Sequence, residues 1–316
     1  MGAASGDRRP RGLHIFFLRT DMKSNTAGYV FTLLAISIFA IQDGISKHLV
    51  SAYPPLLVAM IRYWAFMLFA VAIASRSPGG LRSAVRTKRP TLQIARGLLL
   101  AAQIVVVISS FVMVGLARSQ AILSSGPLIV AMLSIPILGE KVGWRRWLAI
   151  CGGFVGVLLI LKPESGLFDT RFLVPLAGAL LFSLYVVLTR YVSREDSAKT
   201  SFFYTGVVGG IVMSCIGPFF WTTLAPHDWA LMGILCLTGI SSHYFLIRAY
   251  DLLDAVVIQP LTYLQLVFSA IIGVAIFGEK LSTTMIAGAV IVVAAGIFTI
   301  WREHALARAR LKADRA

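Results

Sequence analysis

Long apolar stretches separated by short polar connections dominate this chain. Crossing about 30 Å of hydrocarbon takes an apolar helix of roughly 17–25 residues, and most of the stretches reach or approach that length. The pattern predicts ten spans, at residues 27–50, 55–75, 92–114, 121–138, 147–161, 172–189, 202–221, 230–249, 255–277 and 285–301. The predicted fold class is therefore an all-α polytopic membrane protein with ten transmembrane helices.

A three-residue motif occurs twice, as Gly139-Glu140-Lys141 and as Gly278-Glu279-Lys280. Each copy ends an apolar run and precedes a segment rich in small residues, which indicates an internal duplication. We interpret both glutamates as structural markers of the repeat. Ten spans leave five per half, and an odd number turns the second half upside down relative to the first.

The duplication divides the chain into four parts. Two inverted five-helix repeats are predicted at residues 27–162 and 170–301. They are flanked by a basic leader at 1–26, expected to be disordered, and a basic tail at 302–316. Translation starting at Met1 and translation starting at Met22 both remain open.

Composition agrees with a membrane location. The 316 residues are 58% hydrophobic and 14% charged, with a mean hydropathy of +0.82, so too little charge is left to cover a soluble surface. The net charge of +15 comes from basic residues in short connections, which the positive-inside rule explains without nucleic-acid binding. This charge distribution predicts that both termini lie in the cytoplasm.

Sequence motifs of enzymes are missing from the chain. It contains no His-Glu-x-x-His, no Gly-x-Ser-x-Gly, no phosphate-binding Gly-rich loop and no Cys/His cluster. We therefore predict that the protein is not an enzyme and uses no cofactor or metal.

Ionisable residues inside predicted spans are costly and mark functional sites. Asp43 and Lys47 are four residues apart in the first span, so they share a helix face and could pair. At about 1.5 Å per residue, Asp43 and Arg62 lie at a similar depth, which makes an Asp43–Arg62 pair reasonable. A site for substrate or a proton, a structural ion pair, and a Lys47 side chain that only reaches the interface all remain open.

Polar side chains in other spans complete the predicted site. Gln103, Tyr185, Tyr263 and Gln265 are expected to line a cavity near the middle of the membrane. Arg96 opens the third span, where it either contributes to function or extends its charge to the interface.

These residues resemble those of the drug/metabolite transporter superfamily, in the group built from two EamA-type repeats. The resemblance covers residues 27–301. It rests on Asp43…Ser46-Lys47, Arg62, Arg96-Gly97, Pro127…Glu140, Trp147…Gly153…Gly156, Lys162-Pro163, Ala255…Pro260…Tyr263-Leu264 and Gly278-Glu279.

The resemblance implies a secondary transporter in the bacterial inner membrane that moves a small organic metabolite by alternating access. The pattern is similar to the bacterial riboflavin and S-adenosylmethionine uptake groups, and we expect riboflavin first and S-adenosylmethionine second. Export of amino acids or toxic metabolites is the alternative within the superfamily, and a non-transporting membrane sensor is the alternative from another class. Expected partners are the substrate and the lipid bilayer; a coupling proton and the choice between monomer and homodimer stay open.

Overall fold

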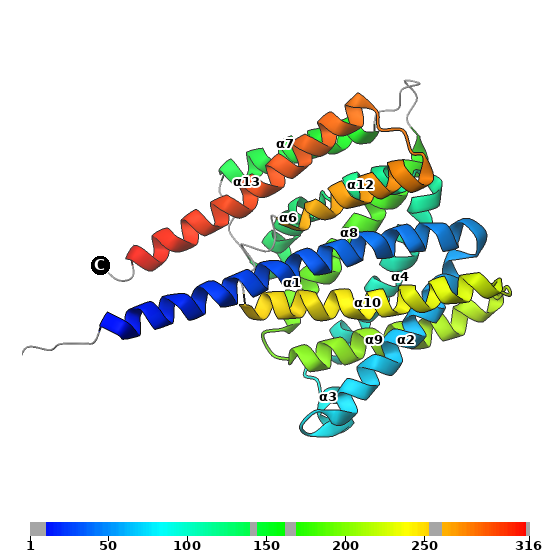
Figure 1. Ribbon diagram of the computed structural model, residues 1–316, viewed down its shortest axis with the longest axis horizontal. Helices are drawn as coiled ribbons and strands as arrows, with labels where there is room; N and C mark the ends of the chain where they lie inside the picture. The colour runs from blue at the N-terminus through cyan, green and yellow to red at the C-terminus, as the bar shows by residue number, and fades with distance from the viewer. Residues whose placement is uncertain (1–10, 140–143, 162–168, 253–260, 314–316) are drawn as a thin grey trace, which may run out of the picture.

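The computed structural model describes residues 11–139, 144–161, 169–252 and 261–313, and within these ranges the chain is helical with short connections (Figure 1). The long helices are α1 (Arg11–Ala52), α2 (Pro55–Arg76), α4 (Pro90–Met113), α8 (Leu173–Val192), α9 (Ala198–Ile216), α10 (Pro226–Leu252) and α13 (Thr283–Ala313). The shorter ones are α3 (Gly80–Val85), α5 (Leu116–Leu123), α6 (Gly126–Leu138), α7 (Trp144–Leu161), α12 (Leu264–Phe277) and the 3-10 turns η1 (Thr170–Phe172) and η2 (Gly217–Phe220).

Seven helical segments are long and apolar enough to cross a membrane, and three further apolar helices are shorter. The seven are 26–52, 55–76, 90–113, 116–138, 170–192, 199–220 and 226–246, and the three are 147–160, 264–277 and 283–298. Each overlaps one predicted span, so the chain is an all-helical, multi-pass membrane protein. The number of ten crossings stays a prediction, because three of the apolar segments are shorter than the length that a crossing needs.

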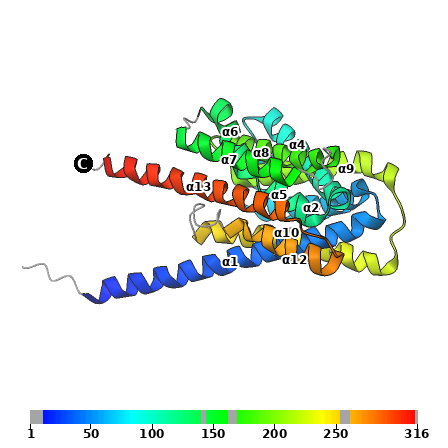
Figure 2. The same ribbon diagram turned by 90° about the horizontal axis from the view of Figure 1, so that it is seen from above.

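The two outermost helices extend beyond their predicted spans. Helix α1 begins at Arg11, inside the predicted leader, and α13 continues to Ala313, inside the predicted tail. The starting residue of α1 and the last residue of α13 lie at the same end of the bundle (Figures 1 and 2). We call this the terminal end; it also carries the connections 77–89 and 193–197. The distal end carries the connections 53–54, 114–115, 217–225 and 278–282.

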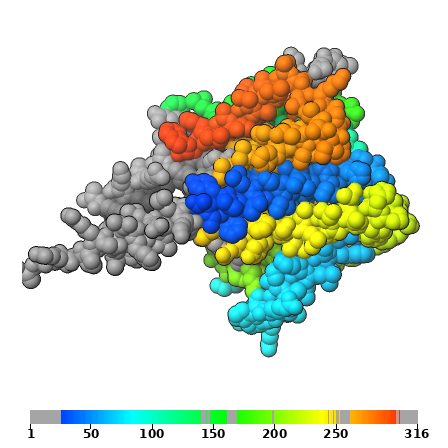
Figure 3. Space-filling view, in the orientation of Figure 1, coloured from blue at the N-terminus to red at the C-terminus, as the bar shows by residue number. Residues whose placement is uncertain are grey.

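Helices of the two halves of the chain pack against each other throughout the bundle. Helix α1 packs on α10 and α4 on α8, while α2 contacts α9, α5 contacts α12, and α7 contacts α13. On the face seen in Figure 3, α12, α1, α10 and α2 lie side by side in that order. In chain order, α1, α2, α4, α5 and α7 of the first half correspond to α8, α9, α10, α12 and α13 of the second. The α2–α9, α5–α12 and α7–α13 contacts therefore join corresponding helices, and the α1–α10 contact corresponds to the α8–α4 contact.

The α7–α13 pair depends on glycine. A Cβ atom on Gly288 would lie 2.5 Å from the carbonyl oxygen of Gly156, and one on Gly156 would lie 2.7 Å from that of Gly288. The backbones therefore approach as closely as small residues allow, which is how helices in lipid gain contact area.

One membrane-spanning segment is interrupted. The sequence predicted a span from residue 121, but helix begins at Leu116 and divides at Ser124 and Ser125 into α5 and α6. The two serine hydroxyls donate to the carbonyls of Ala121 and Ile122, and Pro127 supplies no backbone N–H. Interrupted helices at membrane depth are typical of binding sites in transporters.

Candidate functional site

Three helices meet at the carboxylate of Asp43. Gln120 of α5 donates its side-chain amide to Asp43 Oδ2 at 2.7 Å, and Gln265 of α12 donates to the same oxygen at 2.9 Å. Asp43 is only 9% exposed, so these bonds stabilise a carboxylate that has little access to solvent. We call Asp43, Gln120 and Gln265 the carboxylate layer.

Arg62 of α2 lies beside the carboxylate layer. Its Nη1 atom is 3.5 Å from Ser46 Oγ, and its charge is close enough to Asp43 to interact electrostatically. Within the described residues, however, no ion-pair contact joins Arg62 and Asp43. The two opposite charges therefore share one region without neutralising each other directly, so each retains capacity to bind another group.

A further buried amide lies next to Asp43 on α1. Gln42 precedes Asp43 on α1 and is 7% exposed, and its Oε1 atom has no hydrogen-bond partner. Gly239 of α10 lies opposite, where an added Cβ would come 3.4 Å from that oxygen. A buried acceptor without a partner is unusual and is available to a donor on a bound molecule.

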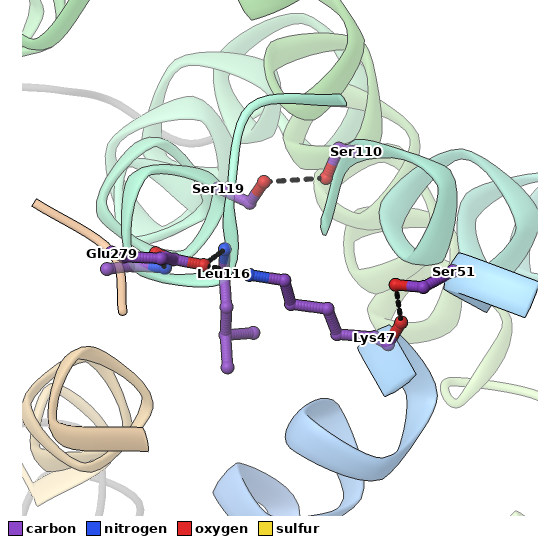
Figure 4. Close-up of polar contacts among 7 residues, drawn as sticks. Lys47, Ser51, Ser110, Leu116, Ser119 and Glu279 are labelled. Carbon is purple, nitrogen blue, oxygen red and sulfur yellow. Dashed lines mark hydrogen bonds and ion pairs between the residues drawn. The ribbon is translucent and has the colours of Figure 1, made fainter. Parts of the chain in front are cut away.

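Lys47 takes a partner that the sequence did not suggest (Figure 4). Lys47 does not pair with Asp43, as the spacing allowed; instead, Lys47 Nζ forms an ion pair with Glu279 and lies 4.1 Å from the centre of the Phe277 ring. Lys47 side-chain exposure is 12%, so it does not extend into solvent as the interfacial alternative required. One helical turn separates this ion pair from the carboxylate layer.

The Glu279 carboxylate also binds the start of α5. It accepts the backbone N–H groups of Leu116, at 2.5 Å, and of Ala117, at 2.9 Å. Gly115 has a φ of +94°, and a Cβ on Gly115 would come 3.0 Å from this carboxylate. A negative charge at a helix N-terminus satisfies free N–H groups and interacts favourably with the helix dipole.

Glu279 was interpreted from the sequence as a structural marker of the repeat, and the structure gives it a more specific position. We call Lys47, Glu279 and the N–H groups of Leu116 and Ala117 the distal cluster. The counterpart residue Glu140 lies outside the described residues. A signal was present in the sequence, since Glu279 and Lys47 are opposite charges near span ends that face the same side.

Arg96 organises a second polar cluster, toward the terminal end. It is 1% exposed, donates from Nε to Thr189 Oγ1 at 2.9 Å, and donates from Nη1 to Gln93. Its guanidinium lies 5.2 Å from the centre of the Tyr185 ring. Because the charge is enclosed by protein, the alternative that Arg96 extends to the interface is wrong.

Asp196 continues this network in the turn between α8 and α9. It accepts from Gln93 Nε2 at 2.8 Å, from the Lys88 backbone N–H at 3.0 Å, and from the Thr87 hydroxyl. Burial raises the pKa of this carboxyl, but the three hydrogen bonds outweigh it, so the pKa of Asp196 lies below its ordinary value. The Arg96 cluster thus joins the two halves of the chain at the terminal end.

The remaining predicted site residues are divided among different surroundings. Gln265 is in the carboxylate layer, and Tyr185 is in the Arg96 cluster. Gln103 is half-buried on α4, in neither group. The Tyr263 hydroxyl is buried without a partner and points at Gly296 of α13, where an added Cβ would lie 1.6 Å away.

The family of the chain follows from comparison with known proteins. The model of the EamA-like transporter family matches residues 26–162 and again residues 172–301. The chain belongs to the EamA-like transporter family. This confirms the predicted superfamily, and the double match agrees with the duplication inferred from the repeated Gly-Glu-Lys motif.

The chain is similar to several transporters. It is 27% identical over 282 residues to an S-adenosylmethionine uptake transporter of Rickettsia prowazekii, covering 89% of this chain and 95% of that relative. A riboflavin transporter of Rhizobium johnstonii is 25% identical, with 90% and 95% coverage. A pseudopaline exporter of Pseudomonas aeruginosa is 23% identical, with 86% and 95% coverage. The family and these relatives are transporters rather than enzymes.

A solved structure supports the fold. It aligns with a TM-score of 0.56 at 18% identity, covering 87% of this chain and 95% of the other.

Proposed function

We propose that this EamA-family protein is a secondary transporter that takes up a small zwitterionic, cofactor-like metabolite by alternating access. The observation that carries the proposal is the position of Arg62 beside the carboxylate layer, which brings the opposite charges of Asp43 and Arg62 together without an ion-pair contact. Ionisable groups inside a membrane protein are costly and are retained where they bind or move a ligand.

The arrangement of the halves supports alternating access. Each of the contacts between the halves described above either joins two corresponding helices or has a counterpart contact when the halves are exchanged. The start of α1 and the end of α13 also lie at the same end of the bundle. Both features are expected of an inverted repeat, in which the two halves rock about a site between them. Asp43 binds Gln120 of the first half and Gln265 of the second, which suits a site at that boundary.

The charges favour S-adenosylmethionine over riboflavin, which reverses the order expected from the sequence. S-Adenosylmethionine carries a sulfonium, an ammonium and a carboxylate, whereas riboflavin has no net charge at neutral pH. Asp43 would bind the cationic part and Arg62 the carboxylate, with Gln42 accepting a hydrogen bond from an amino group. Relatives described as S-adenosylmethionine uptake transporters are also slightly more similar to this chain than the riboflavin transporters.

Charge asymmetry sets the orientation that we propose. The last residue of α2, Arg76, and the terminal-end connection 77–89 together contain five basic residues and no acidic one. Basic residues are concentrated on the cytoplasmic side of inner-membrane proteins, so the terminal end, with both chain termini, would face the cytoplasm.

Export is the second candidate, and the similarity to a pseudopaline exporter favours it. A metabolite with an amino and a carboxyl group would bind to the same two charges during export. Direction of transport separates the two candidates.

The test is uptake into bacterial cells that have no S-adenosylmethionine transporter of their own. Cells expressing the chain should accumulate labelled S-adenosylmethionine, and unlabelled S-adenosylmethionine should compete better than riboflavin. Accumulation of riboflavin alone would restore the order expected from the sequence. Loss of preloaded amino-acid-like substrates with no accumulation of either compound would favour export.

A further inference from the structure

Helices α1, α5 and α12 are connected at two levels, one helical turn apart. The first level is the carboxylate layer, where Asp43 binds Gln120 and Gln265. The second is the distal cluster, where Glu279 binds Lys47 and the start of α5. Lys47 follows Asp43 by four residues and Gln120 follows Leu116 by four, so on both helices the distal cluster lies one turn nearer the distal end.

The Glu279 carboxylate is held in place by the end of its own helix. Gly278 adopts a φ of +62° and ends α12, its N–H donates to the Val274 carbonyl at 3.1 Å, and the Glu279 N–H donates to Gly273 at 3.0 Å. This is a glycine-based C-cap. Because the cap fixes Glu279 to α12, the carboxylate moves with the second half of the chain.

Within the described residues, the partners of the Glu279 carboxylate all belong to the first half. Lys47 is on α1, and the two N–H donors are at the start of α5. The distal cluster therefore joins the halves across their boundary at the distal end. Opening that end separates the halves, and the separation breaks these bonds.

We propose that Glu279 is the residue that closes the distal end over the substrate site, and that its release from Lys47 and α5 opens the site to that side. The proposal rests on the alternating-access function proposed above. Glu279 touches no substrate; it acts by positioning α5 and α12 over the carboxylate layer.

The shared helices link this closure to the substrate. A cationic group bound at Asp43 competes with Gln120 and Gln265 for the same carboxylate oxygen. Release of these amides separates α5 and α12 from α1 at the carboxylate layer. The same two helices also carry residues of the distal cluster. Substrate occupancy therefore weakens the closure one turn away.

Cysteine accessibility tests the proposal without any substrate. Ser119 of α5 is buried and hydrogen-bonded to Ser110 beside the distal cluster (Figure 4). S119C is introduced after Cys151, Cys215 and Cys236 are replaced by alanine, and the purified protein is placed in nanodiscs. The measured quantity is the rate at which a charged thiol reagent modifies residue 119.

We expect E279Q to raise the modification rate about tenfold, the change in equilibrium constant caused by losing one charge-assisted contact. The matched control is E195Q, which breaks the exposed Arg89–Glu195 ion pair at the terminal end and should leave the rate unchanged. E279D, which keeps the charge, should remain within about threefold of the parent, because a charge in that position still satisfies the α5 N-terminus.

An unchanged rate in folded E279Q would overturn the proposal, and so would an equal increase in E195Q. If E279Q does not fold, K47M carries the test, because it removes the cation and leaves Glu279 on the α5 N–H groups; it should raise the rate, and no increase would overturn the proposal. If the parental chain transports S-adenosylmethionine but E279Q leaves the modification rate of residue 119 unchanged, only the proposed closure by Glu279 is refuted. If the modification rates are as expected but the parental chain does not transport S-adenosylmethionine, only the proposed substrate is refuted.

Discussion

Replacing Asp43 by asparagine removes one negative charge from the carboxylate layer and keeps its shape. The new amide oxygen can still accept from Gln120 and Gln265, which donate to Oδ2 at 2.7 and 2.9 Å in the native protein. Both bonds become neutral, and hydrogen bonds to charged groups are worth about 0.5–2 kcal/mol more than neutral ones. Arg62 also loses the nearby negative charge that offsets its burial.

The larger effect should fall on transport. Removing one partner of a buried charge pair costs about 3–5 kcal/mol, and the lower end applies here because the new amide oxygen can still accept hydrogen bonds. About 3 kcal/mol corresponds to a fall on the order of a hundredfold in apparent kcat/KM. We therefore expect D43N to reduce uptake of labelled S-adenosylmethionine to near background.

The assay is initial-rate uptake into proteoliposomes containing equal amounts of protein, with gel filtration to verify folding. The control is D169N, the same carboxylate-to-amide change in the surface pair of Asp169 and Arg171. D169N should transport at the parental rate. Parental transport by D43N would show that the carboxylate layer is structural and would refute the assignment of Asp43 to substrate binding.

Three further predictions concern charge balance and packing. D43N/R62Q should unfold at a higher temperature than D43N alone, because the isolated Arg62 charge is gone; an equal or lower midpoint would mean that the two charges are not coupled. G288A should lower the unfolding midpoint by several degrees, since its Cβ would meet a carbonyl at 2.5 Å, whereas G152A, with no atom within 4 Å of its Cβ, should not. R96K should also lower the midpoint by about 5 °C or more, because a lysine ammonium lacks the planar set of donors with which Arg96 binds Thr189 and Gln93. A parental midpoint would show that these two hydrogen bonds contribute nothing to stability.

Within the described residues, the sequence predicts the positions and order of the apolar segments well, because each satisfies its own backbone hydrogen bonds and is recognisable by composition alone. It predicts the interrupted segment less well. Placing the start of the fourth span at residue 121 left Gln120 in a polar connection, whereas helix begins at Leu116. A polar residue on a short half-helix looks like a loop residue until the packing is known, and one partner of Asp43 was missed for that reason.

Partner choice depends on helix rotation, which spacing along one helix does not determine. Asp43 and Lys47 share a face of α1, so a local pair was reasonable. The face instead meets α5 and α12, and their groups satisfy the two charges separately. Depth along α1 and α2 made an Asp43–Arg62 pair reasonable, but no ion-pair contact joins the two side chains in the described residues, because their lateral separation is set by packing. Tyr263 shows the same limit, since its depth is central but its hydroxyl points at α13.

Counterflow in proteoliposomes tests the proposed transport most directly, because it needs no driving force and no choice of direction. Vesicles preloaded with unlabelled S-adenosylmethionine should accumulate external labelled S-adenosylmethionine transiently when they contain the parental chain, and not when they contain D43N. Equal accumulation in the two preparations would contradict the role of Asp43. No accumulation by folded parental protein would contradict S-adenosylmethionine as the substrate.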